Sequence, residues 1–256
     1  MTIPSVHLKS ISKGRVRWLE PLIHSGLGFC TLISIITTAT IVFVLAKESF
    51  GFFQEIAPSE FFFGTSWVPM FTPSSFGVLP LLWGTLVVTF GAALISIPIG
   101  LASAIYLSEY ASAGKRAVIK PLLELLAGIP TVVYGYFALT FITPALKVVF
   151  PDLQVFNALS GAVVVGVMVL PMIATLSDNA LKAVPDSLRQ GAYALGATSY
   201  EVTSQVVVPA GLSGVMASFI LAISRSIGET MAVTLAAGAT PNLSFTFLES
   251  IQTMTA

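Results

Sequence analysis

Long stretches of the chain contain no charged residue, and they constrain its fold more than any other feature. One such stretch lies between Glu20 and Lys47, and another between Glu60 and Glu109. A helix that crosses the hydrocarbon core of a bilayer needs about 20 mostly apolar residues. Charged residues make up only 9% of the chain, whereas soluble domains contain about a quarter. The sequence therefore predicts an all-α, polytopic membrane protein.

Five apolar runs are candidate membrane spans. They cover residues 22–46, 77–107, 118–142, 159–176 and 212–237. Residues 47–76 end in a stretch rich in turn formers and are expected to form an external loop. Two pairs of helix-breaking residues, Pro98 with Gly100 and Gly128 with Pro130, are candidate break points, although glycine and proline also occur in ordinary membrane helices.

Lysine and arginine in short connections favour the cytoplasmic side of a membrane. On one side of the predicted spans lie Lys9, Lys13, Arg15, Arg17, Lys115, Arg116, Lys182 and Arg189. The other side has only Lys47 and Lys147. The bias predicts a cytoplasmic N-terminus, and five crossings would then leave Ala256 outside.

The longest polar stretch on the cytoplasmic side covers residues 178–210. Within it, Leu188, Ala192 and Leu195 recur at helical spacing, which predicts a short amphipathic helix at the membrane surface. Gly196 is expected to end that helix. The simpler alternative is a loop that only joins two spans.

A spacing pattern in this stretch resembles the cytoplasmic signature of ABC importer permeases, E-A-A-x-x-x-G followed after nine residues by I-x-L-P. Gly196 is followed after nine residues by Val206, Val208 and Pro209, and Gln190, Gly191 and Ala192 stand at the E-A-A positions. The resemblance implies that the loop forms a coupling helix, which docks into a groove of a separate ATPase subunit. Gln190 lacks the charge of the family's glutamate, and a glycine such as Gly191 costs a helix about 0.8 to 1 kcal/mol relative to alanine.

Four longer blocks narrow the resemblance. They read "FGVLPLLWGTL", "LLAGIPTVVYGY", "ALKAVPDSLRQGAYALGAT" and "SRSIGETMAV", in that order. Together they look like the permease subunits of bacterial phosphate-specific ABC importers, and "GETMAV" with "SIQTMTA" resembles the C-type subunit. The resemblance covers roughly residues 66–256.

That resemblance implies a helical bundle of the type I importer kind in the bacterial inner membrane. It implies a sister permease across a central pathway, two ATPase subunits and an external phosphate-binding protein. It also implies a sixth, final span that the sequence lacks, so we expect an incomplete permease. Residues 1–75 would form the tail, first helix and external loop, and residues 76–256 the permease core with its coupling loop.

Two opposite charges, Arg225 and Glu229, stand within the last apolar run. An arginine at the centre of a membrane helix costs roughly 2.5 to 3.5 kcal/mol on insertion scales, so Arg225 is expected to face protein or water. Spacing of four residues would place both charges on one helix face, where they can pair. A guanidinium matches phosphate oxygens, and Glu229 would compete with the anion so that the site releases its cargo. The alternative is an ion pair that only fixes packing against the sister subunit.

A second pair at the same spacing, Lys120 with Glu124, lies in the third predicted span. Lys120 is about one turn from the cytoplasmic end, where its side chain can reach the headgroups. We therefore predict a structural pair or a contact at a cytoplasmic gate.

Several functions have no candidate residues. The chain has no G-x-x-x-x-G-K-[ST] loop, so ATP is expected on a partner subunit and no cofactor on this chain. It has no H-E-x-x-H motif or nucleophile constellation, which argues against an enzyme. His7 and His24 have no companions at metal-ligand spacing, and a net charge of zero gives no hint of nucleic acid.

The predicted function is a permease subunit that imports phosphate, with ATP hydrolysed by a partner. Three alternatives remain at this point: the same machine with sulfate or molybdate as cargo, a secondary anion transporter or channel that uses no ATP, and a structural partner that does not transport.

Overall fold

The computed structural model describes residues 19–244 and 246–256. The tail residues His7, Lys9, Lys13, Arg15 and Arg17 lie outside this range. The chain divides into two compact units, one ending at Pro58 and the other beginning at Ser59.

The first unit contains one long helix, α2 (Leu19–Glu55). Its residues from Pro21 to Gly51 are exposed, and those from Leu22 to Ala46 are mostly apolar on all sides, as expected of a helix that meets lipid. The predicted loop at residues 47–76 is wrong in its first part, because the helix continues to Glu55. Lys47 and Glu48 do not end it, since lysine and glutamate are good helix formers and no proline occurs between Glu48 and Pro58.

The second unit begins with a short helix and a small hairpin. Helix α3 (Pro58–Phe63) is followed by β1 (Trp67–Val68) and β2 (Ser75–Phe76), which pair antiparallel with Trp67 opposite Phe76. The fold class is all-α, as predicted from the sequence.

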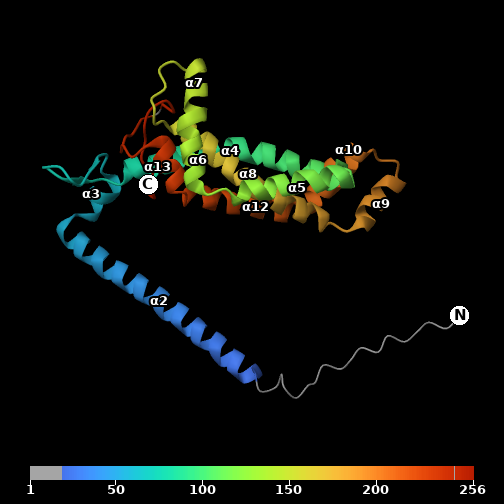
Figure 1. The fold of residues 1–256 in the computed structure, drawn as a ribbon, viewed down its shortest axis with the longest axis horizontal. Helices are drawn as coiled ribbons and strands as arrows, with labels where there is room; N and C mark the ends of the chain where they lie inside the picture. The colour runs from blue at the N-terminus through green and yellow to red at the C-terminus, as the bar shows by residue number, and fades with distance from the viewer. Residues whose placement is uncertain (1–18, 245) are drawn as a thin grey trace. The chain divides into compact units, whose positions relative to one another are not determined.

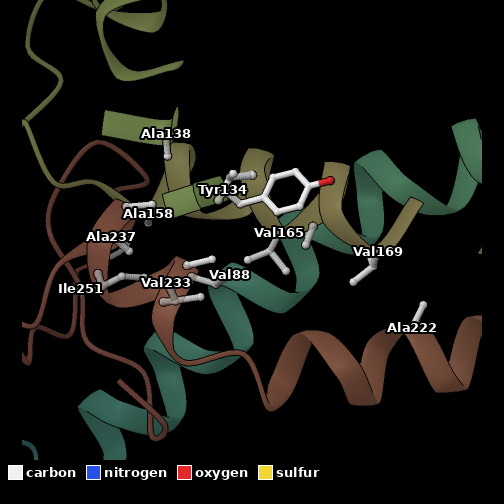
Figure 2. Packing of buried hydrophobic residues seen from close by; sticks show 14 of the residues in the cluster. Val88, Tyr134, Ala138, Ala158, Val165, Val169, Ala222, Val233, Ala237 and Ile251 are labelled. Carbon is white, nitrogen blue, oxygen red and sulfur yellow. The ribbon is translucent and has the colours of Figure 1, made fainter. Parts of the chain in front are cut away.

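Four helices of this unit lie side by side, and they form the bundle seen in Figure 1. They are α4 (Leu79–Ile105), α5 (Ala113–Gly128), α8 (Ala158–Lys182) and α12 (Leu212–Ile227). Helix α4 continues as a π-helix, η1 (Tyr106–Tyr110). Buried side chains from α4, α8, α12 and α13 form the main core, with Val88, Val165, Val169 and Ala222 among them (Figure 2).

Shorter elements gather at the two ends of the bundle (Figure 1). One end carries α9 (Asp186–Ala194), α10 (Ser199–Glu201), the π-helix η3 (Val202–Val207) and α11 (Val208–Ala210). The other end carries α6 (Thr131–Phe137), the π-helix η2 (Ala138–Ile142), α7 (Thr143–Val149) and α13 (Met231–Ala237). We call these the α9 end and the α7 end.

Among the described residues, four helices are long and apolar enough to cross a membrane: Pro21–Glu55, Leu79–Tyr110, Thr131–Val149 and Ala158–Lys182. The segments Ser199–Ala210 and Leu212–Ile227, which meet at 68°, would make a fifth if they count as one span. The first, second and fourth predicted spans are thereby confirmed, each with shifted ends.

The third predicted span, residues 118–142, is wrong as a single helix. Helix α5 ends at Gly128 and α6 begins at Thr131, with Ile129 in an extended conformation (φ −68°, ψ 129°). Pro130 causes the break, because it lacks an N–H and disfavours helical geometry in the residue before it. Pro98, the other candidate break point, lies inside the continuous helix α4.

The fifth predicted span, residues 212–237, also breaks. Helix α12 ends at Ile227, Gly228 caps it, and α13 begins at Met231. Glu229 therefore lies between two helices, and the prediction that it shares a helix face with Arg225 is wrong. Glycine, the poorest helix former after proline, stands at this break.

A buried carboxylate connects α5 to α8. The side chain of Asp178 is fully buried, with Lys120 Nζ 2.8 Å from Oδ2 and Lys182 Nζ 2.6 Å from Oδ1. The predicted pairing of Lys120 with Glu124 is therefore wrong: Lys120 pairs across helices instead. A carboxylate without contact to water needs a cationic partner far more than the exposed Glu124 does.

Substitution of Asp178 tests this connection. Asp178→Asn leaves two ammonium groups without their carboxylate, and water screens them only partly, since the lysine side chains are 36% and 31% exposed. We expect a loss of about 1 to 3 kcal/mol in the free energy of unfolding. The measurement is equilibrium unfolding in detergent micelles.

The matched control is Glu124→Gln, which removes the partner expected from the sequence. It should change the free energy of unfolding by less than about 0.5 kcal/mol. Equal effects of the two substitutions would contradict the pairing seen in the structure.

Candidate functional site

The predicted charge pair lies where α12 ends. Arg225 is in the last turn of α12, and its Nη2 is 3.3 Å from Oε2 of Glu229. The Arg225 side chain is 49% exposed, while that of Glu229 is 3% exposed. The two predicted pathway residues are thus together, one open to the surroundings and the other enclosed.

Glu229 is held in place by more than the arginine. Its Oε1 accepts a hydrogen bond from the backbone N–H of Ala232, 3.2 Å away in the first turn of α13. Its backbone carbonyl accepts a bond from Thr255 Oγ1 at 2.8 Å. The carboxylate therefore joins the two halves of the broken helix and has little freedom to move.

Arg225 has fewer contacts. Within the described part of the chain, Glu229 is its one ion-pair partner, and the contact uses a single guanidinium nitrogen. A guanidinium has five N–H donors in a rigid fork. Most of these donors are free to bind another acceptor.

Arg225 lines a hollow of about 180 Å³. The other lining residues come from the α5–α6 break and from α8: Ala127, Ile129, Thr131, Met168, Val169 and Met172. Arg225 is the one charged side chain in this lining. An anion that enters the hollow would find a single positive charge with mostly apolar walls around it.

Both broken helices meet near this hollow. Helices α6 and α13 pack against each other, and a Cβ added to Gly135 of α6 would lie only 2.7 Å from the Cβ of Leu235 in α13. The hydroxyl of Tyr134 donates to the carbonyl of Leu126 at 2.7 Å, which adds to the bond that this carbonyl accepts from the Ile129 N–H where α5 ends. Irregular backbone at membrane depth is tolerated where it is buried in protein or lines a water-filled cavity.

A second, more open hollow of about 560 Å³ adjoins the first at Ile129. It follows α5 from Pro130 and Gly128 back to Glu124 and Pro121. Glu124, which the sequence suggested as a partner of Lys120, lines this hollow instead. The two hollows share Ile129 in their linings, and the second one extends along α5 as far as Pro121.

The predicted coupling residues lie at the α9 end. Gln190 and Gly191 are exposed on α9, and Ala192 is partly buried. Gly196 follows the helix with φ +86°, a conformation that favours glycine, and so ends it as the sequence predicts. Pro209 is exposed in α11.

Large apolar side chains are exposed around these residues. Leu188, Tyr193, Leu195 and Tyr200 are 46%, 49%, 91% and 73% exposed. Beneath them, Val202 and Val207 pack with Leu181, Val184 and Val215 in a separate core cluster. The α9 end thus has a packed apolar core and exposed apolar side chains on its outer surface. Exposed apolar patches of this kind mark surfaces that bind protein partners.

Sequence reasoning missed two charged groups. Asp178 has a local signal, since it precedes Lys182 by four residues, but it was placed in the loop rather than in α8. Glu109 pairs with Arg189, 80 residues later, at 3.1 Å. No local pattern could have joined those two residues.

Comparisons with known proteins agree with this architecture. Residues 96–255 match the family described as binding-protein-dependent transport system inner membrane component. The chain is 37% identical over 213 residues to the probable ABC transporter permease protein YqgH of Bacillus subtilis, covering 82% of this chain and 69% of that protein.

Two phosphate transport system permease proteins PstC are also similar. The one from Mesorhizobium japonicum is 32% identical over 82% of this chain and 68% of its own length. The one from Pasteurella multocida is 32% identical over 86% of this chain and 74% of its own length. An inward-facing structure of the MetNI methionine ABC transporter superimposes on 59% of the chain at 22% identity, with a TM-score of 0.49, which is too low to support a conclusion.

The family match spans more than half of the chain and includes both broken helices and the α9 end. Such permeases are multi-pass inner membrane proteins, are not enzymes, and work with an ATPase and a substrate-binding protein. This chain therefore belongs to the binding-protein-dependent inner membrane transport components, as a permease of the type I ABC importer kind.

Proposed function

We propose that this chain imports inorganic phosphate, as the C-type permease of an ATP-driven importer. Arg225 carries the proposal: it is a half-exposed guanidinium in a hollow between two broken helices. The phosphate cargo is supported by the names of the PstC relatives. The more similar YqgH carries no cargo in its name, which keeps sulfate and molybdate as candidates.

The chemistry of the hollow suits a tetrahedral oxyanion. Guanidinium N–H groups form short, charge-assisted hydrogen bonds to phosphate oxygens, often two at once. Glu229 is fixed by the Ala232 N–H and stays 3.3 Å from the guanidinium, so it competes with the anion for the same donors. A carboxylate beside the cation weakens binding enough for the anion to leave.

The partners follow the family. The hollow opens on a face that a sister permease would cover, so that the pathway lies between two permeases. One of two ATPase subunits would bind the α9 end through Gln190, Gly191, Ala192, Gly196 and Pro209. The two ATPase subunits would hold the ATP. An external protein would deliver phosphate at the α7 end.

The orientation in this proposal places the N-terminus in the cytoplasm. Lys115, Lys182 and Arg189 lie at or near the α9 end, which agrees with the cytoplasmic preference of basic residues. Residues 1–75 would serve as an anchor and external loop, and residues 76–256 as the transport core.

Uptake of labelled phosphate tests the function. Vesicles contain this chain with its sister permease, ATPase and binding protein, and ATP is supplied on the cytoplasmic side. We expect Arg225→Gln to lower the maximal uptake rate about 10- to 100-fold, since a hydrogen bond to a charged group contributes about 1.5 to 3 kcal/mol. Arg225→Lys should lower the maximal uptake rate less, because lysine keeps the positive charge but lacks the forked N–H donors of the guanidinium.

The control is Lys47→Gln, which removes an exposed charge on α2, in the unit that does not contain the hollow. It should leave uptake unchanged. ATP-dependent uptake of labelled sulfate or molybdate, with no uptake of labelled phosphate, would assign another cargo to the same machine. Uptake without ATP would point to a secondary transporter, and parent-level uptake by Arg225→Gln would reject the role of the arginine.

A second prediction concerns release of the anion. Glu229→Gln removes the competing charge but keeps a carbonyl oxygen that can accept from the Ala232 N–H. Phosphate should then stay longer on Arg225 and lower the maximal uptake rate. Because such ion pairs contribute about 1 kcal/mol or less, we expect up to about a fivefold effect in single-turnover release measurements. Faster release in this variant would contradict the competition.

A further inference from the structure

Arg189 lies in α9 but turns inward, and its side chain is only 15% exposed. Nη1 donates to the carbonyl of Val184 at 2.5 Å, and Nη2 donates to the carbonyl of Leu181 at 2.8 Å. Leu181 lies in the last turn of α8, where its carbonyl also accepts from the Val184 N–H, and Val184 follows the end of the helix. Arg189 therefore fastens α9 to α8.

The same guanidinium also holds Glu109, in the π-helix η1 that continues α4. Nη2 donates to Oε1 at 3.1 Å and Nε to Oε2 at 3.3 Å, and the Glu109 side chain is 11% exposed. Such two-bond pairing fixes the relative orientation of the two groups. The hydrogen bond to Glu109 also raises the pKa of Arg189, so the arginine stays charged.

A second arginine, in the helix that follows η1 in the chain, also holds this π-helix in place. Arg116, in α5, donates to the carbonyl of Leu107 at 2.6 Å through Nη2 and 3.0 Å through Nε, and to that of Ser108 at 3.2 Å. Helix α5 then runs to Gly128, and Ala127 near its end and Ile129 just after it line the hollow with Arg225. A continuous set of contacts thus leads from α9 through η1 to the hollow.

We propose that Arg189, Glu109 and Arg116 make η1 a joint that carries movement of α9 into α5 and so opens or closes the hollow at Arg225. The inference rests on the proposed function, because α9 moves only if a partner pulls on it. These are positioning residues: Arg189 and Glu109 are nearly enclosed, and none of the three lines the hollow.

The principal variant is Glu109→Gln, which removes the charge of the inward partner while keeping its size. In reconstituted complexes we expect the ATPase to copurify and to hydrolyse ATP at the parent rate. Uptake per ATP hydrolysed should fall by about 5- to 150-fold, the usual span of coupling between sites. Arg189→Gln and Arg116→Gln should have the same phenotype, and combining any two should add little to either alone.

Asp186→Asn is the matched control. Asp186 also contacts Arg189, at 3.1 Å, but its side chain is 83% exposed. It should leave uptake per ATP unchanged. Parent-level uptake per ATP in Glu109→Gln would overturn the joint. A loss of uptake in Arg189→Gln that only matches its loss of ATPase binding would also overturn it, because Arg189 would then serve docking or folding.

A second readout separates this inference from the cargo. Ala127→Cys in a Cys30→Ala background places a thiol at the hollow, and its reaction with a water-soluble reagent is measured with and without ATP. In the parent we expect ATP to change the reaction rate, and in Glu109→Gln we expect no change. If ATP changes the rate but phosphate is not taken up, the cargo proposal fails and the joint stands. An ATP effect that persists in Glu109→Gln would reject the joint whatever the cargo.

Discussion

A charge in an apolar setting needs a partner or water, and this constraint decides where the few internal charges of the chain lie. Asp178 has no contact with water and is held by two lysines. Glu109 meets the fork of Arg189. Arg225 keeps half of its side chain exposed, while its partner Glu229 is enclosed, and it lines the hollow. Its place in that lining distinguishes it from the lysines on Asp178, which hold helices together.

The two helix breaks also help to place Arg225 and its partner at the hollow. Pro130 ends α5 and Gly228 ends α12, and both interruptions lie beside the hollow or its arginine. Without the break after α12, Glu229 would be one more residue of a continuous helix. Without the break after α5, the backbone at Ile129 and Thr131 would be part of a regular helix. The broken backbone instead has local partners, such as the bond from Tyr134 to Leu126.

Many of the helices and one of the charge pairs could be predicted from the sequence, because composition and local residue patterns determine them. Charge-free runs located α4 and α8, the spacing of Leu188, Ala192 and Leu195 located α9, and Gly196 ended it. The pairing of Arg225 with Glu229 was also found, since four residues separate them. The partners of Lys120 and Arg189 were not, because those contacts join residues far apart in the chain. The break at Gly228 was also missed, although the polar residues 224–230 and their glycine are a local signal for it.

Water access to the hollow beside Arg225 is the most direct test of the transport route. Thr131→Cys, in a Cys30→Ala background and in the full complex, places a thiol among the residues that line it. We expect a water-soluble thiol reagent to modify this cysteine, phosphate to slow the reaction, and Arg225→Gln to abolish that protection while the reaction itself continues. A thiol that never reacts, or that phosphate protects equally well without Arg225, would contradict an anion route past this arginine.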